Sequence, residues 1–397
     1  MQRSTLVCLF LSALLHAGFA MAQQKAVTDT SFKPSGKLWG YTFGDYYYKA
    51  HADVMHRGGA NQYTGIEKGR NAFQLRRVYL GYTYDISPAF TAEVLLAAED
   101  NLTTSTGFTT GDLLGDSKLS FYIKLANLRW KNIWKGTDLV VGQVATPAFS
   151  LVTEPVWGYR AVERTVADIR RTPSFDLGAA LQGKFDSKAN FGYNLMVGNG
   201  NGARPENDKF KWFYGDVFAK FLDKRLVLDL YADYNRLNQT PTWHHARNMV
   251  KAFIAYTTPA FTIGVEAFTN HGKQDVIAMN TLKRDTISAK AEAISAFIKG
   301  SIIKDKLGFF TRMDHYNPDV KYNNNLYTSY NGLTGSYEPN NKELFFTLGL
   351  DFTPVKNVHF IPNLWYNRYT SNHSGLTGSA YRDHDLVYRL TFFYVYR

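Results

Sequence analysis

Apolar and polar residues alternate with a period of two along most of this chain. The pattern is clearest from Asp385 to Arg397, where polar positions such as Arg389 and Thr391 alternate with an apolar set: Leu386, Tyr388, Leu390, Phe392, Tyr394 and Tyr396. Residues two apart in a β-strand point to the same face, so this segment has one apolar side and one mixed side. The same alternation recurs throughout the chain and predicts an all-β protein.

Sixteen segments show this strand pattern. Most are bounded by residues that favour turns, such as Gly, Pro, Asn and Asp. We predict strands at Gly36–Tyr48, Ala72–Ile86, Phe90–Glu99, Lys118–Trp130, Thr137–Thr146, Phe175–Phe185, Asn190–Gly198, Lys211–Leu222, Arg225–Leu237, Arg247–Tyr256, Phe261–Asn270, Ile287–Ile303, Leu307–Tyr316, Lys342–Phe352, Val358–Tyr369 and Asp385–Arg397. The facing of the strands at 137–146 and 287–303 stays open, because each can be read in two registers.

The connections between these segments alternate between short and long. Short turns lie at 87–89, 186–189, 223–224, 257–260, 305–306 and 353–357, and the intervening links run from about nine to over twenty-five residues. Bacterial outer-membrane barrels combine short periplasmic turns with long external loops. The pattern therefore predicts a transmembrane antiparallel β-barrel of about 16 strands with both of its ends on the periplasmic side.

The charged positions indicate which face of each strand meets the interior. Asp229 and Asp233 lie opposite an apolar set in one strand, and Glu343 and Asp351 do so in another. A charge that faced lipid at mid-membrane would cost roughly 2–4 kcal/mol, so these groups are expected to face inward. A barrel of sixteen strands is wide enough to hold an aqueous channel.

The first residues have the features of an export signal. Arg3 is followed by an apolar run from Leu6 to Leu15 and by the small-residue pattern Ala20-Met21-Ala22. We predict a signal peptide at 1–22, a short periplasmic segment at 23–35 and a single barrel domain at 36–397. Cleavage would remove Cys8, the one cysteine, which excludes a disulfide scaffold and a cysteine nucleophile.

Charge and aromatic content add two expectations. The 45 basic and 34 acidic residues give a net charge of +11, which suits anionic solutes or anionic lipid heads, although charges on solvated loops would give the same total. Aromatic residues gather near strand ends, as at 46–48 and 212–214. Such side chains favour the interface between hydrocarbon and water.

Three short segments resemble porins of the Bacteroidota outer membrane related to the phosphate-selective porin O and P family. The run from Arg70 to Tyr82 is similar to an early strand of that family, Phe175–Gly183 to the strand after its third loop, and Val197–Gly202 to an "NGxG" strand exit. The resemblance implies a passive homotrimeric channel whose third external loop folds into the pore. The chain departs from the pattern at its end, which is Tyr396-Arg397 instead of Phe.

The third long loop, at 147–173, is the predicted constriction. It carries four arginines among three carboxylates, and guanidinium groups bind phosphate or carboxylate with paired hydrogen bonds. The same charges could instead form exposed ion pairs on a solvated loop. The predicted pore-lining bases are Arg160, Arg164, Arg170 and Arg171 of the loop, with Arg77, Lys124, Lys184, Lys220 and Arg389 of the wall. Inward carboxylates at Glu93, Asp229, Glu266 and Asp351 oppose them.

These patterns predict a passive outer-membrane porin for small hydrophilic solutes, weakly selective for anions, in contact with outer-membrane lipid. Two alternatives stay open. A binding or adhesion barrel would close its lumen and use its loops, above all 317–341, and an outer-membrane hydrolase could use Asn372-His373-Ser374. We predict no cofactor, no metal site and no nucleic-acid partner: His244-His245 lies in a predicted loop without a spaced third ligand, and no basic–aromatic module is recognisable.

Overall fold

The computed structural model describes residues 32–58, 62–99, 120–170, 173–206, 208–239, 243–322, 326–333, 337–339, 341–372 and 381–396. The predicted signal peptide and Arg397 lie outside these residues. Within them the chain forms strands and two short helices, α2 (Thr153–Trp157) and α3 (Val166–Ile169). The strands are β1 (Ser35–His51), β2 (Asn71–Ser87), β3 (Phe90–Glu99), β4 (Tyr122–Trp134), β5 (Thr137–Ala145), β6 (Phe175–Lys184), β7 (Phe191–Gly198), β8 (Trp212–Phe221), β9 (Leu226–Gln239), β10 (His244–Thr257), β11 (Phe261–Met279), β12 (Arg284–Ile303), β13 (Leu307–Asn317), β14 (Ser329–Gly332), β15 (Lys342–Val355), β16 (Val358–Thr370) and β17 (His384–Tyr396).

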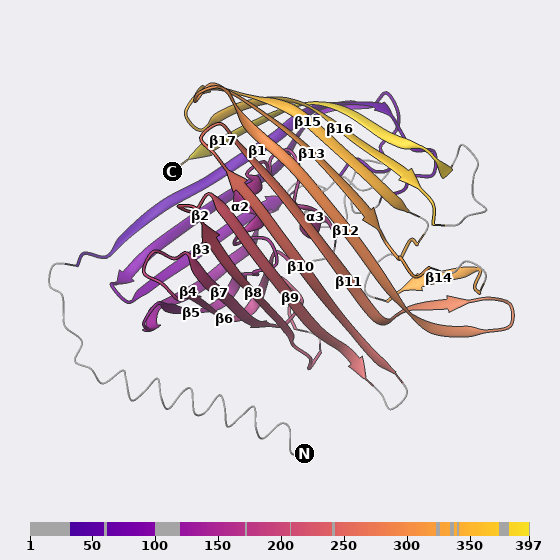
Figure 1. Ribbon diagram of the computed structural model, residues 1–397, viewed down its shortest axis with the longest axis horizontal. Coiled ribbons are helices and arrows are strands. Elements are labelled where there is room, and N and C mark those ends of the chain that lie inside the picture. Colours follow the sequence, from indigo (N-terminus) through magenta and orange to yellow (C-terminus); the bar gives the residue numbers. More distant parts are fainter. Residues whose placement is uncertain are drawn as a thin grey trace, which may run out of the picture.

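Sixteen of these strands form a closed antiparallel barrel. Each pairs with the next along the chain, except that β13 pairs with β15, and the ring closes where β17 pairs with β1. Gly40 lies opposite Tyr396 at this seam, so the start of β1 and the end of β17 share one rim (Figure 1). The predicted barrel is confirmed, and closure joins what would otherwise be the two free edges of its sheet, β1 and β17.

Tight turns connect the strands at the rim that carries both ends of the barrel. Several turn residues have positive φ, among them Asp223 (56°), Asp305 (58°) and Asn357 (70°). Asn and Asp tolerate this conformation better than most residues, and it matches the twist of paired strands. One short turn was missed by the sequence reading, because β4 continues to Trp134 and reverses at residues 135–136.

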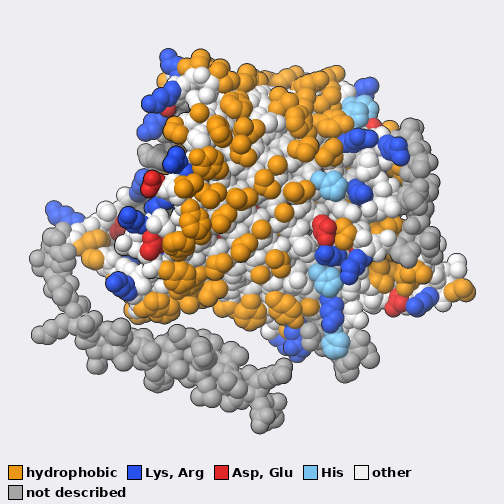
Figure 2. All heavy atoms as spheres, in the orientation of Figure 1, with side chains coloured by type: hydrophobic (Ala, Val, Ile, Leu, Met, Phe, Trp, Pro, Cys, Tyr) orange, Lys and Arg blue, Asp and Glu red, His pale blue; other side chains and the backbone are white. Residues whose placement is uncertain are grey.

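The barrel surface carries a hydrophobic belt, which is the set of exposed apolar side chains that alternate with inward polar ones. Leu230, Val250 and Ile294, for example, are at least half exposed, while Asp229 and Lys251 on the same strands are buried inside. Figure 2 shows apolar side chains covering the wall, with charged residues gathered towards its two ends. No helix among the described residues is long and apolar enough to cross a membrane.

Two predictions about the strand ends were wrong in part. Tyr46 and Tyr48 are exposed, as an interfacial position requires, but Tyr47 is buried inside, and Trp212 and Tyr214 are likewise inward. Alternation allows only every second aromatic to meet the membrane. The link expected between residues 270 and 287 is mostly strand, because β11 and β12 extend beyond the rim as a long hairpin on which β14 packs.

The two facings that the sequence left open are resolved by burial. In β12, Ala293, Ser295 and Phe297 are buried inside and Ile294 faces outward, and in β5, Val140 is buried while Val141 is exposed.

Candidate pore constriction

The loop between β5 and β6, residues 146–174, folds into the barrel and is called the third loop below. Its helices α2 and α3 lie inside the ring of strands in Figure 1. α2 ends at Gly158, whose φ of 71° is favourable for glycine, and the Thr165 side chain accepts a hydrogen bond from Asp168 N at the start of α3. The predicted inward fold is confirmed.

Apolar contacts hold the third loop against the wall. Trp157 is 1% exposed and packs on Phe297 and Phe310, with ring centroids 5.0 and 6.1 Å away. Val166 and Ala167 belong to a second buried cluster that includes residues of β5 and β8. A buried Trp contributes several kcal/mol of packing, so the loop position is fixed by burial as well as by charge.

Polar contacts tether the same loop to strands around the ring. Arg76 of β2 donates to Ala161 O (2.8 Å), Lys251 of β10 to Thr153 Oγ1 (2.9 Å), and Arg312 of β13 to Arg164 O (2.6 Å). On the remaining side, Arg170 pairs with Glu343 of β15 at 2.5 Å and Trp365 of β16 donates to Glu163 Oε2 at 2.8 Å. The loop therefore reaches across the lumen and narrows it.

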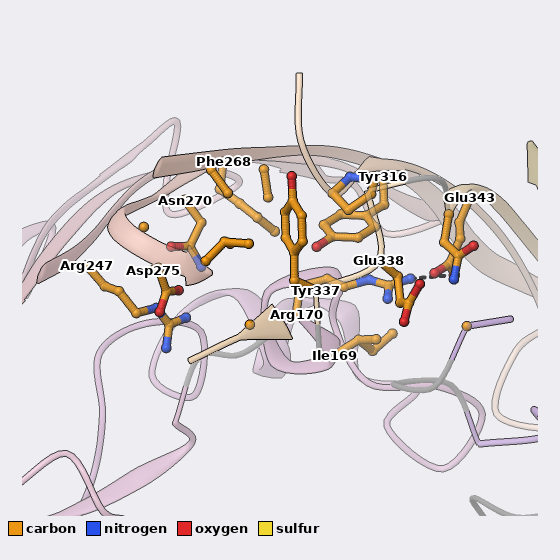
Figure 3. Close-up of a pocket in the computed structure, with 18 residues that line it drawn as sticks. Ile169, Arg170, Arg247, Phe268, Asn270, Asp275, Tyr316, Tyr337, Glu338 and Glu343 are labelled. Atoms are coloured by element: carbon orange, nitrogen blue, oxygen red, sulfur yellow. Dashed lines mark hydrogen bonds and ion pairs between the residues drawn. The ribbon is translucent and has the colours of Figure 1, made fainter. Parts of the chain in front are cut away.

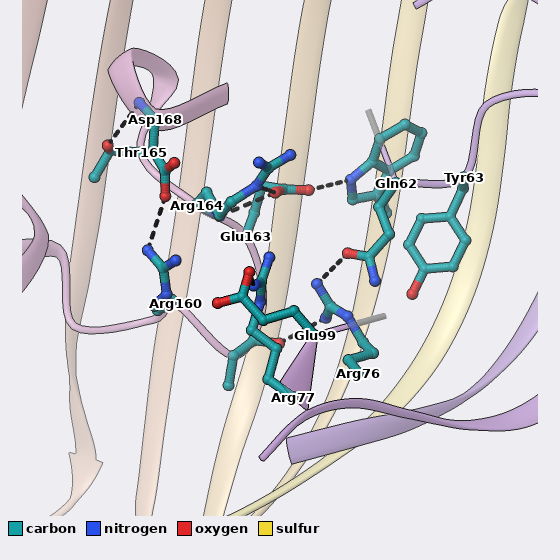
Figure 4. A network of polar contacts seen from close by, with 12 residues as sticks. Gln62, Tyr63, Arg76, Arg77, Glu99, Arg160, Glu163, Arg164, Thr165 and Asp168 are labelled. Atoms are coloured by element: carbon teal, nitrogen blue, oxygen red, sulfur yellow. Dashed lines mark hydrogen bonds and ion pairs between the residues drawn. The ribbon is translucent and has the colours of Figure 1, made fainter. Parts of the chain in front are cut away.

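Six bases gather where the third loop meets β2, β4 and β17, and we call them the basic cluster. Figure 4 shows four of them, Arg76, Arg77, Arg160 and Arg164. Arg76, Arg77 and Lys124 come from the wall near the third loop, Arg160 and Arg164 from the loop itself, and Arg389 from β17. The predicted bases Arg77, Lys124, Arg160, Arg164 and Arg389 are thus brought together, and Arg76 joins them.

Carboxylates lie among these bases. Arg77 and Lys124 share Glu99, Arg76 lies 3.2 Å from Asp45, and Arg160 contacts both Glu154 and Asp168. Glu163 is the fifth carboxylate, next to Arg164. Six bases against five carboxylates leave a formal excess of one positive charge, so the field on a passing anion is attractive but weak.

Two guanidinium groups of the basic cluster each have a nitrogen whose hydrogen bond is not made. Arg76 Nε and Arg389 Nη2 are buried and have no hydrogen-bond acceptor among the described residues. An unmade hydrogen bond of a buried charged group is costly, so a water molecule that reached these nitrogens would be bound favourably.

Burial opposes ionisation of Glu163, but the charges of Arg164, Arg76 and Arg389 and the Trp365 hydrogen bond outweigh it and lower its pKa. The carboxylate is therefore charged at neutral pH and offsets part of the basic cluster.

β-Bulges position two of the bases. The pairing of β1 with β2 shifts between Phe43 and Gly44, which leaves Arg76 as the extra residue, and the pairing of β3 with β4 shifts in the same way at Lys124. A bulge lets consecutive residues escape strict alternation, so Arg76 and Arg77 are both buried inside. Sequence alternation alone would have sent one of them to the lipid, which explains why Arg76 was missed.

The wall opposite the basic cluster is acidic. Asp216 of β8, Asp229 of β9 and Glu266 of β11 surround Lys251 of β10, whose Nζ lies 2.9 Å from Asp229 and 3.9 Å from Glu266. All four are at most 3% exposed. Because β9 and β10 lie half a ring away from β1 and β2, the two charge groups set up a transverse field across the narrowed lumen.

Cavities lie on both sides of the third loop. One of about 90 Å³ faces the long external loops and is lined by Arg170, Arg247, Tyr316, Tyr337 and Glu343 (Figure 3). The other, of about 360 Å³, lies near the turn at 258–260 and is lined by Tyr159 and Ala161 of the loop and by His359. Both contain polar and apolar side chains, as expected of vestibules for hydrated solutes.

Two predicted site residues, Lys184 and Lys220, lie away from the constriction. Lys184 is exposed at the end of β6, and Lys220 is half-buried near the end of β8 with its Nζ 5.2 Å from the Phe218 ring. Both have inward register but lie beside the tight turns, too far along their strands to meet the third loop. Arg171 lies outside the described residues. Arg170 is placed on the external cavity, 4.0 Å above the Tyr316 ring.

The residues behind the alternative readings are also accounted for. His244 and His245 begin β10, so the predicted loop was wrong there, and His245 Nε2 lies 2.7 Å from Asp275. The Asn372 side chain donates to Asn317 Oδ1 (2.7 Å) and Pro339 O (2.7 Å). His373 and Ser374 lie outside the described residues.

No protein-family model matches this chain, and no curated protein shows significant sequence similarity to it. Solved structures share its fold. The outer-membrane channel DcaP of Acinetobacter baumannii is 11% identical with a TM-score of 0.60, covering 91% of this chain and 97% of that one. The anion-selective porin from Comamonas acidovorans is 12% identical with a TM-score of 0.57, covering 92% and 100%. OmpT of Vibrio cholerae, described as expressed in the outer membrane, is 12% identical with a TM-score of 0.53, covering 92% and 99%.

Proposed function

We propose that this protein is a passive outer-membrane porin that admits small hydrophilic solutes and weakly prefers anions of the phosphate or carboxylate type. The observation that carries the proposal is the position of the third loop, which crosses the lumen between two polar cavities. Arginines of the loop and arginines of the barrel wall meet there, and the wall arginines Arg76 and Arg312 donate to backbone carbonyls of the loop. A charged passage inside an apolar-coated barrel filters solutes by size and charge.

The paired charges set the expected selectivity. Each base of the basic cluster lies near a carboxylate, and the acidic wall opposes the whole cluster. The transverse field should orient dipolar solutes, and the small positive excess near the third loop should favour chloride over potassium only modestly.

Similar structures agree with this proposal, since two of the three named above are described as an anion-selective porin and an outer-membrane channel. The predicted export signal and the hydrophobic belt support residence among outer-membrane lipids. The homotrimer is proposed from the sequence resemblance, and native mass spectrometry in detergent tests it.

Conductance in planar bilayers tests the function. The purified mature protein should give stable channels, and replacement of residues 153–169 by a short Gly/Ser link should enlarge the unit conductance several-fold, because it removes the crossing segment. In a salt gradient the reversal potential should indicate a mild chloride preference. A cation preference would overturn the anion part of the proposal.

A closed binding barrel is the second candidate, and the reach of the third loop favours it. The loop touches β2, β10, β13, β15 and β16. If the wild type carries no current while the loop-replaced variant conducts, the lumen is closed and the external loops become the site to examine. A lipase or peptidase assay with His373→Ala tests the hydrolase alternative.

A further inference from the structure

Two histidines and an aspartate meet at the external end of the barrel seam. His51 is the last residue of β1, His384 is the first residue of β17, and Asp383 immediately precedes it. One potential ligand atom from each lies within 4.8 Å of the others. The three are brought together by the pairing of β17 with β1, which places His51 opposite Leu386.

The Asp383 carboxylate is held by backbone groups from both sides of the seam. Its Oδ2 accepts a hydrogen bond from Val54 N (3.0 Å) and its Oδ1 from His384 N (2.8 Å). Its backbone carbonyl accepts from Tyr369 N of β16 at 2.8 Å. Contacts from the β1, β16 and β17 sides therefore fix this residue, as supporting groups do for ligands in metal sites.

The histidine nitrogens lie at a suitable distance from that carboxylate. Nδ1 of His51 and Nδ1 of His384 are each 3.6 Å from Asp383 Oδ1. Two ligands bound at about 2.0–2.1 Å from one ion and separated by that distance subtend roughly 120°, which is close to a tetrahedral or trigonal arrangement.

The two imidazole rings are stacked on each other. The imidazoles stack with centroids 4.0 Å apart and planes 8° apart, and His51 Nδ1 lies 2.8 Å from His384 O. Coordination requires one ring to turn so that its lone pair points at the ion. Both side chains are about one-third exposed, 35% and 33%, so this rotation disturbs no packed core.

Three carboxylates lie at this end of the seam, and two of them are already paired with bases. Asp53 pairs with Arg57, and Asp385 pairs with Lys49. Asp383 differs, because its ion-pair partners among the described residues are the two histidines. Arg368, opposite His384 in the β16–β17 pairing, and Arg382, next to Asp383 in the sequence, are basic neighbours of the cluster.

We propose that His51, Asp383 and His384 form a binding site for a divalent transition-metal cation of the zinc type, with water at the remaining positions. Imidazole nitrogen with one carboxylate suits zinc, nickel or copper, whereas magnesium and calcium prefer oxygen ligands alone. The bound ion would link β1 to β17 at the point where the barrel closes. This site is independent of the porin function.

Zinc titration of the purified mature protein in detergent, after treatment with a chelator, tests the proposal. Competition with a fluorescent zinc chelator should report one tight equivalent. His51→Ala and His384→Ala should each weaken binding by at least about tenfold, in line with the loss of a ligand. Asp383→Asn keeps an oxygen that can accept one of the two backbone hydrogen bonds but loses the charge, and it should weaken binding as well.

His315→Ala is the matched control, because His315 is an exposed residue near the end of β13 and is not part of the cluster. It should leave zinc affinity unchanged. Zinc should also raise the temperature at which the barrel unfolds on semi-denaturing gels, in the wild type and in this control but not in the His384→Ala variant.

Copper(II) electron paramagnetic resonance gives an independent measurement, in which the wild type should show two coupled nitrogens and each single histidine variant should show one. The proposal is overturned if the double variant His51→Ala with His384→Ala binds zinc as tightly as the wild type. It is equally overturned if folded wild type shows no saturable zinc binding.

Discussion

Replacing Glu163 by Gln should make the constriction measurably more selective for anions. The amide keeps one oxygen, which can accept the Trp365 Nε1 hydrogen bond, 2.8 Å long in the wild type, but its NH2 group cannot accept the Arg164 backbone N–H bond of 2.9 Å that the other carboxylate oxygen accepts. The side-chain shape and the bond to β16 are therefore kept, while one negative charge and one hydrogen bond within the third loop are removed. Because the pKa of Glu163 lies below its ordinary value, the wild-type group is fully charged at neutral pH.

The size of the effect follows from Coulomb's law. An ion that passes about 6 Å from this group in a water-like dielectric feels roughly 0.7 kcal/mol per unit charge, which is about a threefold change in its local concentration. In the Glu163→Gln variant the local concentration of anions rises by that factor and the local concentration of cations falls by it, so the chloride-to-potassium permeability ratio should rise by up to about tenfold. The measurement should be made near 0.1 M salt, where the screening length is about 10 Å and the charge of residue 163 still acts on a passing ion.

Reversal potentials across a salt gradient provide the assay. Glu206→Gln is the matched control, because Glu206 lies between β7 and β8, near the external rim, where it pairs with Lys211, and its replacement changes the total charge equally. An unchanged potential in Glu163→Gln, or an equal shift in both variants, would refute the assignment of the filter to the third loop.

Three further predictions concern stability and can be checked by urea unfolding of the barrel in lipid vesicles. Lys251→Met should lower the free energy of unfolding by about 3–5 kcal/mol, because it leaves Asp229 and Glu266 buried without their base. Adding Asp229→Asn should restore part of this loss, and an unchanged stability of the Lys251→Met variant would contradict the acidic-wall geometry. Leu230→Arg in the hydrophobic belt should cost roughly 2–4 kcal/mol, and tolerance would mean that this face does not meet lipid. Trp157→Ala should cost about 3–5 kcal/mol and increase current noise, whereas a quiet, stable variant would show that the third loop is held by its ion pairs alone.

Much of the fold could be read from the sequence because a strand's facing is a local property. The alternation of Asp229 with Leu230, or of Thr347 with Leu348, needs no knowledge of neighbouring strands. Membrane energetics then assign the apolar side to lipid, since an outward charge is too costly. The inward fold of the third loop was implied by the family resemblance, and five bases of the basic cluster were expected from their charge and their place in that loop or on the inward face of a strand.

The predictions about the site that were wrong concern residues where the alternation of the strand is broken, or where the position along the strand decides whether a side chain reaches the third loop. Arg76 is turned inward by a bulge, which depends on the partner strand and is not encoded by a period of two. Lys184 and Lys220 have the correct facing, but their height above the periplasmic rim is set by strand tilt and register. The paired carboxylates also reduce the field that the arginines alone would suggest.

The sequence by itself determined that this chain is a lipid-facing barrel with a polar interior, because hydrophobic periodicity and turn spacing are local properties that depend only on neighbouring residues in the sequence. Only the tertiary structure decided which charges meet. Lys49 and Asp385 lie 2.6 Å apart although 336 positions separate them, and His51 and His384 stack across the same seam. Such contacts depend on ring closure and register, which are collective properties of all the strands and cannot be read from any one of them.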